Sequence, residues 1–162
     1  MASARRAKGR HFLLYWQQWA VDYVVERQQP LGRIGSSHFR LASPGDTIWI
    51  VGVARGRVHL VGRLRAAEVL SRRAAVQRTG EELSGRYYAF AARGAAERAR
   101  KIDITQLVSR LRFESEHDRL DPDNPLLWPM QLQTMRALAP ASARLLEQAW
   151  ASAECGVRNA EW

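Results

Sequence analysis

The chain has 162 residues, of which 46% are hydrophobic and 25% are charged, and its formal net charge is +9. This length and composition fit one globular domain and exclude a largely disordered chain. The single cysteine, Cys155, excludes an intramolecular disulfide and any metal site built from cysteines alone, so a cytoplasmic location is expected. No stretch approaches the roughly 20 apolar residues needed to span a bilayer, so no membrane partner is expected.

Arginine supplies almost all of the positive charge, because Lys8 and Lys101 are the only lysines among the 25 basic residues. A charge excess of this size attracts polyanions such as nucleic acid. Arginine in particular can donate two hydrogen bonds at once to a phosphate or to the edge of a guanine. Counting alone does not separate this interpretation from a general enrichment in arginine.

The chain begins with a basic tail, residues 1–10, which is expected to be disordered or to add phosphate contacts. The apolar and aromatic residues 11–16 predict a first strand. Residues 17–29 follow a helical pattern in which three side chains are spaced to share a face: Trp19, Tyr23 and Val24.

A β-hairpin is the clearest pattern in the middle of the chain. A polar segment, residues 31–41, and a turn at residues 43–46 precede it. Residues 47–53 predict one strand and residues 58–69 its partner, joined at residues 54–57.

Shorter elements follow the hairpin. The sequence predicts a helix or loop at residues 71–83, a strand at 86–91, short helices at 94–101 and 104–111, and the start of a strand at 112–113. A final helix has Pro140 near its first turn and runs towards Gly156, which leaves residues 157–162 as a C-terminal tail. Because the chain has no repeat and no linker, residues 11–156 are expected to form a single α+β domain.

Motifs for catalysis or cofactor binding are absent from the sequence. None of the four histidines pairs with another histidine or with Cys155 at zinc-ligand spacing. No nucleophile elbow, phosphate-binding loop or dinucleotide fingerprint occurs. The acidic residues between 114 and 123 are interpreted as a solvated, turn-rich loop rather than a metal site. We therefore expect a protein that is not an enzyme and that needs no cofactor and no metal.

Six tryptophans in 162 residues are more than usual. Trp49 and Trp150 fall in the middle of predicted elements and are expected in the core. Trp16, Trp19 and Trp128 stand at the ends of elements beside polar residues, where an aromatic ring can stack on a base. A protein that reads one base takes it out of the stack, between flat walls and polar groups that contact its edge.

The sequence offers candidates for each part of such a site. The candidate walls of a base pocket are Tyr15, Trp16, Trp19 and Trp128. The candidate edge contacts are Ser36, Ser37, His38, Gln131 and Gln133. The candidate contacts to a nucleic-acid backbone are Arg33, Arg40, Arg55, Arg57, Gln131, Gln133 and Arg136.

The order of these features resembles the EVE domains of the PUA-like superfamily and, more distantly, the YTH and ASCH domains. The resemblance covers most of residues 10–150. It is carried by the aromatic first strand, the segment Gly35-Ser36-Ser37, Pro44-Gly45-Asp46 before the strand at 47–50, the hairpin strand at 56–69, and residues 131–138. The segment near Gly35 departs from EVE and YTH domains, because it lacks the tryptophan that commonly stands there.

The resemblance implies a PUA-like twisted, partly open β-barrel of five or six strands flanked by helices. It also implies a pocket for a flipped, modified base, with Trp16, Trp19, the segment 36–38, Trp128 and residues 131–136 around it. Related domains occur fused to nucleases. No nuclease is present here, so a separate effector or nuclease protein is implied as a partner.

Three other functions stay open beside recognition of a modified base in DNA, where methylated or hydroxymethylated cytosine and methylated adenine are the bases expected. RNA binding by the same fold is one, because contact with the 2′-hydroxyl needs only one ordinary polar group. A non-catalytic protein-interaction subunit, with tryptophans in the interface, is another. A small ASCH-like hydrolase is the weakest, since no spacing of residues supports a catalytic set.

Overall fold

The computed structural model describes residues 9–115 and 119–160, and for residues 155–160 it describes the backbone only. The strands are β1 (His11–Tyr15), β2 (Pro30–Leu31), β3 (Arg33–Ser36), β4 (Thr47–Ala54), β5 (Arg57–Ser71), β6 (Tyr87–Ala91), β7 (Glu97–Arg98), β8 (Ile102–Asp103) and β9 (Arg136–Ala137). The helices are α1 (Gln18–Glu26), α2 (Arg72–Thr79), α3 (Trp128–Gln131) and α4 (Pro140–Ala160), with short 3₁₀ helices η1 (Ser37–Leu41), η2 (Thr105–Arg110) and η3 (Pro125–Leu127).

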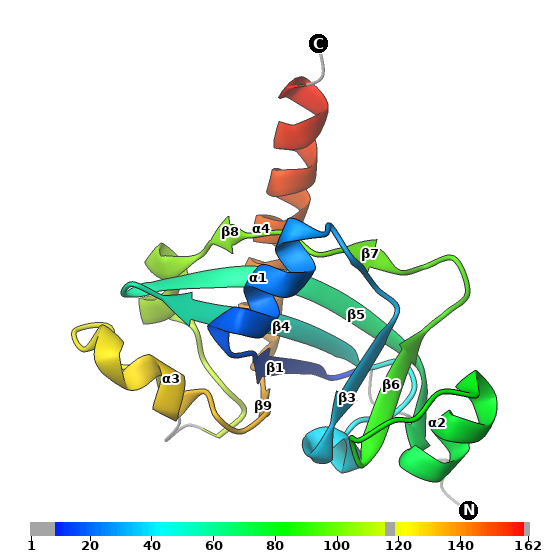
Figure 1. The fold of residues 1–162 in the computed structure, drawn as a ribbon. Coiled ribbons are helices and arrows are strands. Elements are labelled where there is room, and N and C mark those ends of the chain that lie inside the picture. Colours follow the sequence, from blue (N-terminus) through cyan, green and yellow to red (C-terminus); the bar gives the residue numbers. More distant parts are fainter. Residues whose placement is uncertain (1–8, 116–118, 161–162) are drawn as a thin grey trace, which may run out of the picture.

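The long strand β5 organises the main sheet, whose order is β3-β6-β5-β4-β1-β9, with β8 also paired to β5 (Figure 1). The first part of β5, residues 57–65, pairs with β4, and its last part, residues 66–71, pairs with β6. Irregularities in register on both sides of β5 bend the sheet. Within the described residues, no pairing joins β3 to β9, so the path of strands is open.

The sheet has a hydrophobic core on each face because successive residues of a strand point to opposite sides. One core combines alternate residues of β1 and β4 with α1: Phe12, Leu14, Ile48, Ile50, Val21 and Val24. The other combines the intervening residues of the same strands with α4: Leu13, Trp49, Val51, Leu146 and Trp150. Figure 1 shows α1 in front of the sheet and α4 behind it.

Two local features explain how α1 and the hairpin are placed. At the turn between β4 and β5, Arg55 and Gly56 have φ values of 51° and 70°, the left-handed pair that a type I′ hairpin turn requires. In the middle of β4, a Cβ on Gly52 would lie 2.7 Å from Cγ2 of Val21 in α1. The absence of a side chain at Gly52 therefore lets α1 pack directly on the strand.

The structure confirms the α+β class and the main elements expected from the sequence. The strands at 11–16, 47–53, 58–69 and 86–91, the helix within 17–29 and the helix that begins at Pro140 are all present. Trp49 and Trp150 are buried, as expected. No helix in the described ranges has the length and apolar character needed to cross a bilayer.

Three predictions about the chain were wrong. Residues 94–101 are not a helix but a turn followed by β7, because residues 97 and 98 pair with β2 and the Glu97 carboxylate binds Arg63. Arg10 does not belong to a free tail, since its backbone N–H donates to Asp46 Oδ1 at 2.8 Å. The tail expected from residue 157 is helical as far as Ala160, where α4 ends. Residues 1–8 and 161–162 of the two expected tails lie outside the described residues.

Candidate base-binding groove on helix α1

An aromatic groove lies where β1 ends and α1 begins. Its volume is about 390 Å³, and its walls are Tyr15, Trp16, Gln17, Trp19, Ala20, Tyr23 and Val24. Five of these residues precede or occupy the first turn of α1, so the connection between strand and helix forms most of the groove. Three of the four predicted wall residues, Tyr15, Trp16 and Trp19, therefore come together as the sequence suggested.

The outer face of α1 carries two large exposed rings. The side chains of Trp19 and Tyr23 are four residues apart, and the residues are 72% and 50% exposed. Residues at this spacing are neighbours on one face of a helix. Val21 and Val24 are buried against the sheet instead. The helix thus covers the core with its valines and presents aromatic rings to solvent.

A hydrogen bond holds the Trp19 ring, and a cation–π contact holds the Tyr23 ring. Trp19 Nε1 donates to Gln17 Oε1 at 2.7 Å, so the indole N–H is satisfied while most of the ring remains accessible. The Arg27 guanidinium lies 3.9 Å from the centre of the Tyr23 ring, and its Nη1 donates to the Tyr23 carbonyl at 3.1 Å. These contacts reduce the side-chain entropy that a ligand would have to restrict on binding.

Tyr15 and Trp16 support the groove from the end of β1. The Trp16 backbone N–H donates to the Val51 carbonyl at 2.9 Å, which continues the pairing with β4. Its half-buried ring packs against the core under α1, and the half-buried ring of Tyr15 packs against the core on the α4 side. The base of the groove is therefore anchored in both cores of the protein.

The predicted edge contacts at residues 36–38 are not part of this groove. Ser36 Oγ accepts a hydrogen bond from the His38 backbone N–H at 3.1 Å and so caps η1. Ser37 is exposed and His38 is half-buried, and neither lines the groove. In Figure 1 this segment follows β3 at the bottom of the view, whereas α1 lies near the centre.

The prediction that Trp128 forms a pocket wall was wrong. Trp128 is only 2% exposed and belongs to the core on the α4 side. Its Nε1 donates to the Asp121 carbonyl at 2.6 Å, which satisfies the polar group that a rim tryptophan would offer to water or ligand. Pro125 begins η3 just before it.

The predicted contact residues Gln131 and Arg136 are hydrogen-bonded to other residues within the segment 121–136. Gln131 accepts a hydrogen bond from the Asp121 backbone N–H at its Oε1, at 3.3 Å. The Gln131 carbonyl accepts from Nε of Arg136 at 2.9 Å. Arg136 also lies over the Phe113 ring, 5.9 Å from its centre. Gln131 and Arg136, which were predicted to contact a nucleic-acid backbone, therefore have structural roles in the folded chain.

The other residues that were predicted to contact a nucleic-acid backbone divide into two groups. Arg33 and Arg57 form ion pairs with Glu81 and Asp103, at 2.8 and 3.0 Å. Exposed side chains without a hydrogen-bond or ion-pair partner among the described residues are Arg40, Arg55 and Gln133. They belong to separate segments, since Arg55 is at the β4–β5 turn and Arg40 is in η1.

Sequence reasoning missed three residues to which the candidate site gives a role, and one of them is Gln17, which lines the groove and holds the Trp19 indole. Tyr23 lines the groove, and Arg27 lies over its ring. The signal was present, because Trp19, Tyr23 and Arg27 are spaced four residues apart within one predicted helix. The prediction had placed Trp19 and Tyr23 on one face but had assigned a binding role to Trp19 alone.

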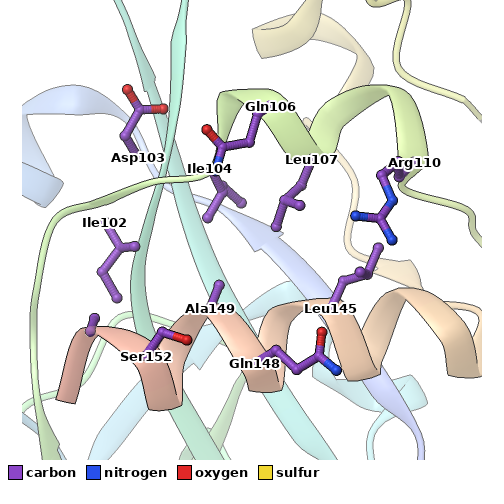
Figure 2. A pocket seen from close by; sticks show the side chains of 11 residues that line it. Ile102, Asp103, Ile104, Gln106, Leu107, Arg110, Leu145, Gln148, Ala149 and Ser152 are labelled. Carbon is purple, nitrogen blue, oxygen red and sulfur yellow. The ribbon is translucent and has the colours of Figure 1, made fainter. Parts of the chain in front are cut away.

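A second hollow separates η2 from α4 and has a volume of about 430 Å³ (Figure 2). Apolar side chains such as Leu107, Leu145 and Ala149 form much of its lining. Its carboxylate, on Asp103, accepts hydrogen bonds from the side chain and backbone of Thr105, and these hold the pKa of Asp103 below its usual value. A carboxylate with a lowered pKa stays ionised at neutral pH, so it is a weak general base and does not serve as a general acid.

The described part of the chain holds no group of three or more His, Cys, Asp or Glu side chains that could bind a metal ion. No family model and no curated protein matches the chain. Among solved structures it is similar to one described as a hypothetical protein from Leishmania major, with 11% identity and a TM-score of 0.45, over 89% of this chain and 96% of that one.

Proposed function

We propose that the protein is a nucleic-acid-binding module that takes an unstacked, modified base into the groove on α1. The observation that carries this proposal is the pair of rings on the outer face of α1, Trp19 and Tyr23, which border an open groove with Tyr15 and Trp16. Contiguous exposed apolar surface marks interaction sites and ligand-binding grooves in soluble proteins. The chain's net charge of +9 favours a polyanion as the ligand.

The groove has the parts that recognition of a base requires. Aromatic rings provide flat apolar surfaces on which any base can stack. Gln17 contributes an amide to the lining, and the oxygen of this amide also accepts from the Trp19 indole. Burying one methyl group of a modified base against these rings is worth about 1 kcal/mol, which corresponds to roughly a fivefold preference.

The resemblance of the sequence to EVE domains also supports this proposal. In that comparison, Trp16 and Trp19 follow the first strand, where pocket residues of such domains lie. The bent strand β5 and the helices on both faces of the sheet are compatible with a partly open PUA-like barrel, which is part of the proposal. DNA is the favoured nucleic acid, and RNA is the alternative tested with it.

The test is binding to short DNA and RNA strands, each unmodified or carrying one methylated or hydroxymethylated base, at two salt concentrations. We expect one modification to bind about fivefold tighter than its unmodified control, or tighter still, and this preference to persist at high salt. Affinity from phosphate contacts falls steeply with salt, whereas discrimination by the groove does not. Trp16→Ala and Trp19→Ala should remove the preference.

A matched control for these variants is Leu126→Ala, because Leu126 is 90% exposed and lies outside the groove. It should change neither affinity nor preference. Equal binding of all strands, lost at high salt, would contradict recognition of a modified base. Modification-dependent binding that survives both tryptophan substitutions would place the site elsewhere in the molecule.

A further inference from the structure

Three side chains form a line along the exposed face of α1. Trp19, Tyr23 and Arg27 follow one another at intervals of four residues, which places them on successive turns of the helix and its C-terminal cap. The first two present rings to solvent, and the third places a guanidinium on the Tyr23 ring. The line therefore runs from an accessible indole, through a tyrosine, to a positive charge.

The spacing of the two rings limits what can stack on both. Four residues of an α-helix rise about 6 Å, whereas successive nucleotides of a duplex strand are about 3.4 Å apart along the axis. Two neighbouring bases that lie on Trp19 and Tyr23 must therefore be separated from each other. A paired and stacked duplex does not offer bases in this arrangement, but an extended single strand does.

The charges at the end of α1 suit a phosphate backbone. Arg27 is joined there by Arg98 of β7, whose Nη1 donates to the Gln28 carbonyl at 3.2 Å. Both arginines are exposed, so their remaining N–H groups face water. The nearby carboxylates are those of Asp22, which accepts from Gln18 at 2.6 Å, and of exposed Glu26.

We propose that this face of α1 binds two consecutive unpaired nucleotides of a single strand. One base stacks on Trp19 and the next on Tyr23, on the ring face opposite Arg27, while Arg27 and Arg98 contact the phosphates. This inference rests on the proposed function of the groove and names its substrate as single-stranded. It requires no base modification, so the two proposals can fail separately.

The experiment compares an unmodified, labelled eight-nucleotide DNA strand with the same strand in a blunt duplex, using fluorescence anisotropy and the intact protein. We expect the single strand to bind at least tenfold tighter. Trp19→Ala and Tyr23→Ala should each weaken it about 5- to 150-fold, because stacking contributes about 1–3 kcal/mol per base. Tyr23→Phe keeps the ring and should retain most of the affinity.

Further variants separate stacking and charge from damage to the fold. Both rings are exposed, so their replacement should leave the melting temperature nearly unchanged. Glu26→Gln should tighten binding, since it removes a negative charge beside the proposed phosphate path. Quenching of tryptophan fluorescence by the strand should decrease in Trp19→Phe, whereas Leu126→Ala should match the unaltered protein in every measurement.

The outcomes distinguish this inference from the proposed function. If unmodified duplex binds as tightly as the single strand, or if Tyr23→Ala has no effect, the two-nucleotide site is wrong. Recognition of a modified base could still hold in that case, and the oligonucleotide panel would report it. If single strands bind through both rings with no preference for any modification, the inference stands and modified-base recognition fails.

Discussion

The guanidinium of Arg63, on strand β5, donates to Glu147 Oε2 of helix α4 at 2.6 Å. It also forms a bidentate pair with Glu97 of β7, in which Nε donates to Oε2 at 2.8 Å and Nη2 donates to Oε1 at 2.6 Å. The Arg63 side chain is only 13% exposed, and it lies 5.7 and 5.8 Å from the ring centres of Trp49 and Trp150. A single enclosed cation thus joins α4 and β7 to the back of the sheet.

Replacing Arg63 should destabilise the protein strongly. Arg63→Met leaves the Glu97 carboxylate without its cation and leaves Glu147 only the exposed Arg65, at 3.8 Å. Breaking a buried pair costs about 3–5 kcal/mol. Because the Glu97 and Glu147 side chains are 28% and 34% exposed, we expect a loss near the lower end, about 3 kcal/mol in the free energy of unfolding. Urea denaturation followed by circular dichroism measures it.

The control for this prediction is the exposed ion pair between Arg78 and Glu68, whose side chains are 49% and 43% exposed. Exposed pairs contribute about 0–1 kcal/mol, so Arg78→Met should cost less than about 1 kcal/mol. If the two arginine variants lose the same stability, the Arg63 cluster does not hold α4 in place.

The stability of the fold should decrease when His11 is protonated. Trp49 Nε1 donates to His11 Nδ1 at 3.0 Å, which requires that nitrogen to be unprotonated. Burial lowers the pKa of His11 below its ordinary value of 6.5, against a smaller opposing effect of Glu147. The unfolded chain therefore takes up a proton at a higher pH than the folded chain, and the free energy of unfolding falls as the pH drops through 6.5.

Urea unfolding at pH 7.5 and at pH 5 checks this, with His11→Gln as the comparison. Glutamine can still accept from the Trp49 indole but does not titrate. Burial also lowers the pKa of His59, so the variant should keep a smaller decrease with pH. Identical pH dependence in the two proteins would show that His11 does not titrate with folding.

The sequence predicted the strands of the sheet well because their burial follows local patterns. Residues 47–53 are a nearly continuous apolar run, which is typical of a strand buried on both faces, and the structure places its alternate side chains in opposite cores. The β4–β5 turn was equally visible, because Gly56 favours the left-handed backbone that the turn requires. Local patterning was sufficient for these elements.

The errors arose where distant contacts determine the structure. Residues 94–101 have a helical composition, but Glu97 is drawn into the cluster around Arg63, 34 residues away in the sequence. Trp128 appeared to be a rim residue from its polar neighbours, yet the carbonyl of Asp121 satisfies its N–H in the core. The edge contacts at residues 36–38 were misplaced for the same reason, since nothing in the local sequence indicates which loops meet around α1.

The position of α1, and with it the groove, should depend on the absence of a side chain at Gly52. A Cβ there would lie 2.7 Å from Cγ2 of Val21, which is fully buried and has a stiff, branched side chain. Gly52→Ala should therefore lower the free energy of unfolding by about 1–3 kcal/mol and weaken binding in the groove. Thermal unfolding and oligonucleotide affinity are the two measurements.

A double-mutant cycle tests the proposed clash. Val21→Ala alone should also destabilise, because it leaves a cavity under α1. Combined with Gly52→Ala, it makes room for the new methyl group, so the double variant should be more stable than the sum of the single losses implies. Simple additivity of the two losses would mean that the strand, and not the helix, absorbs the added methyl group.

Arg27 should contribute to binding through its charge more than through its contact with Tyr23. If it meets a phosphate, Arg27→Gln should reduce the slope of log affinity against log salt by about 0.7 for a single strand, because one fewer counterion contact is released. Arg27→Lys keeps the charge and should keep the slope. Arg144→Gln, an exposed arginine on α4 behind the sheet, is the matched control and should leave the slope unchanged (Figure 1). An unchanged slope in Arg27→Gln, with affinity still reduced, would mean that Arg27 acts by orienting the Tyr23 ring and that the phosphates lie elsewhere.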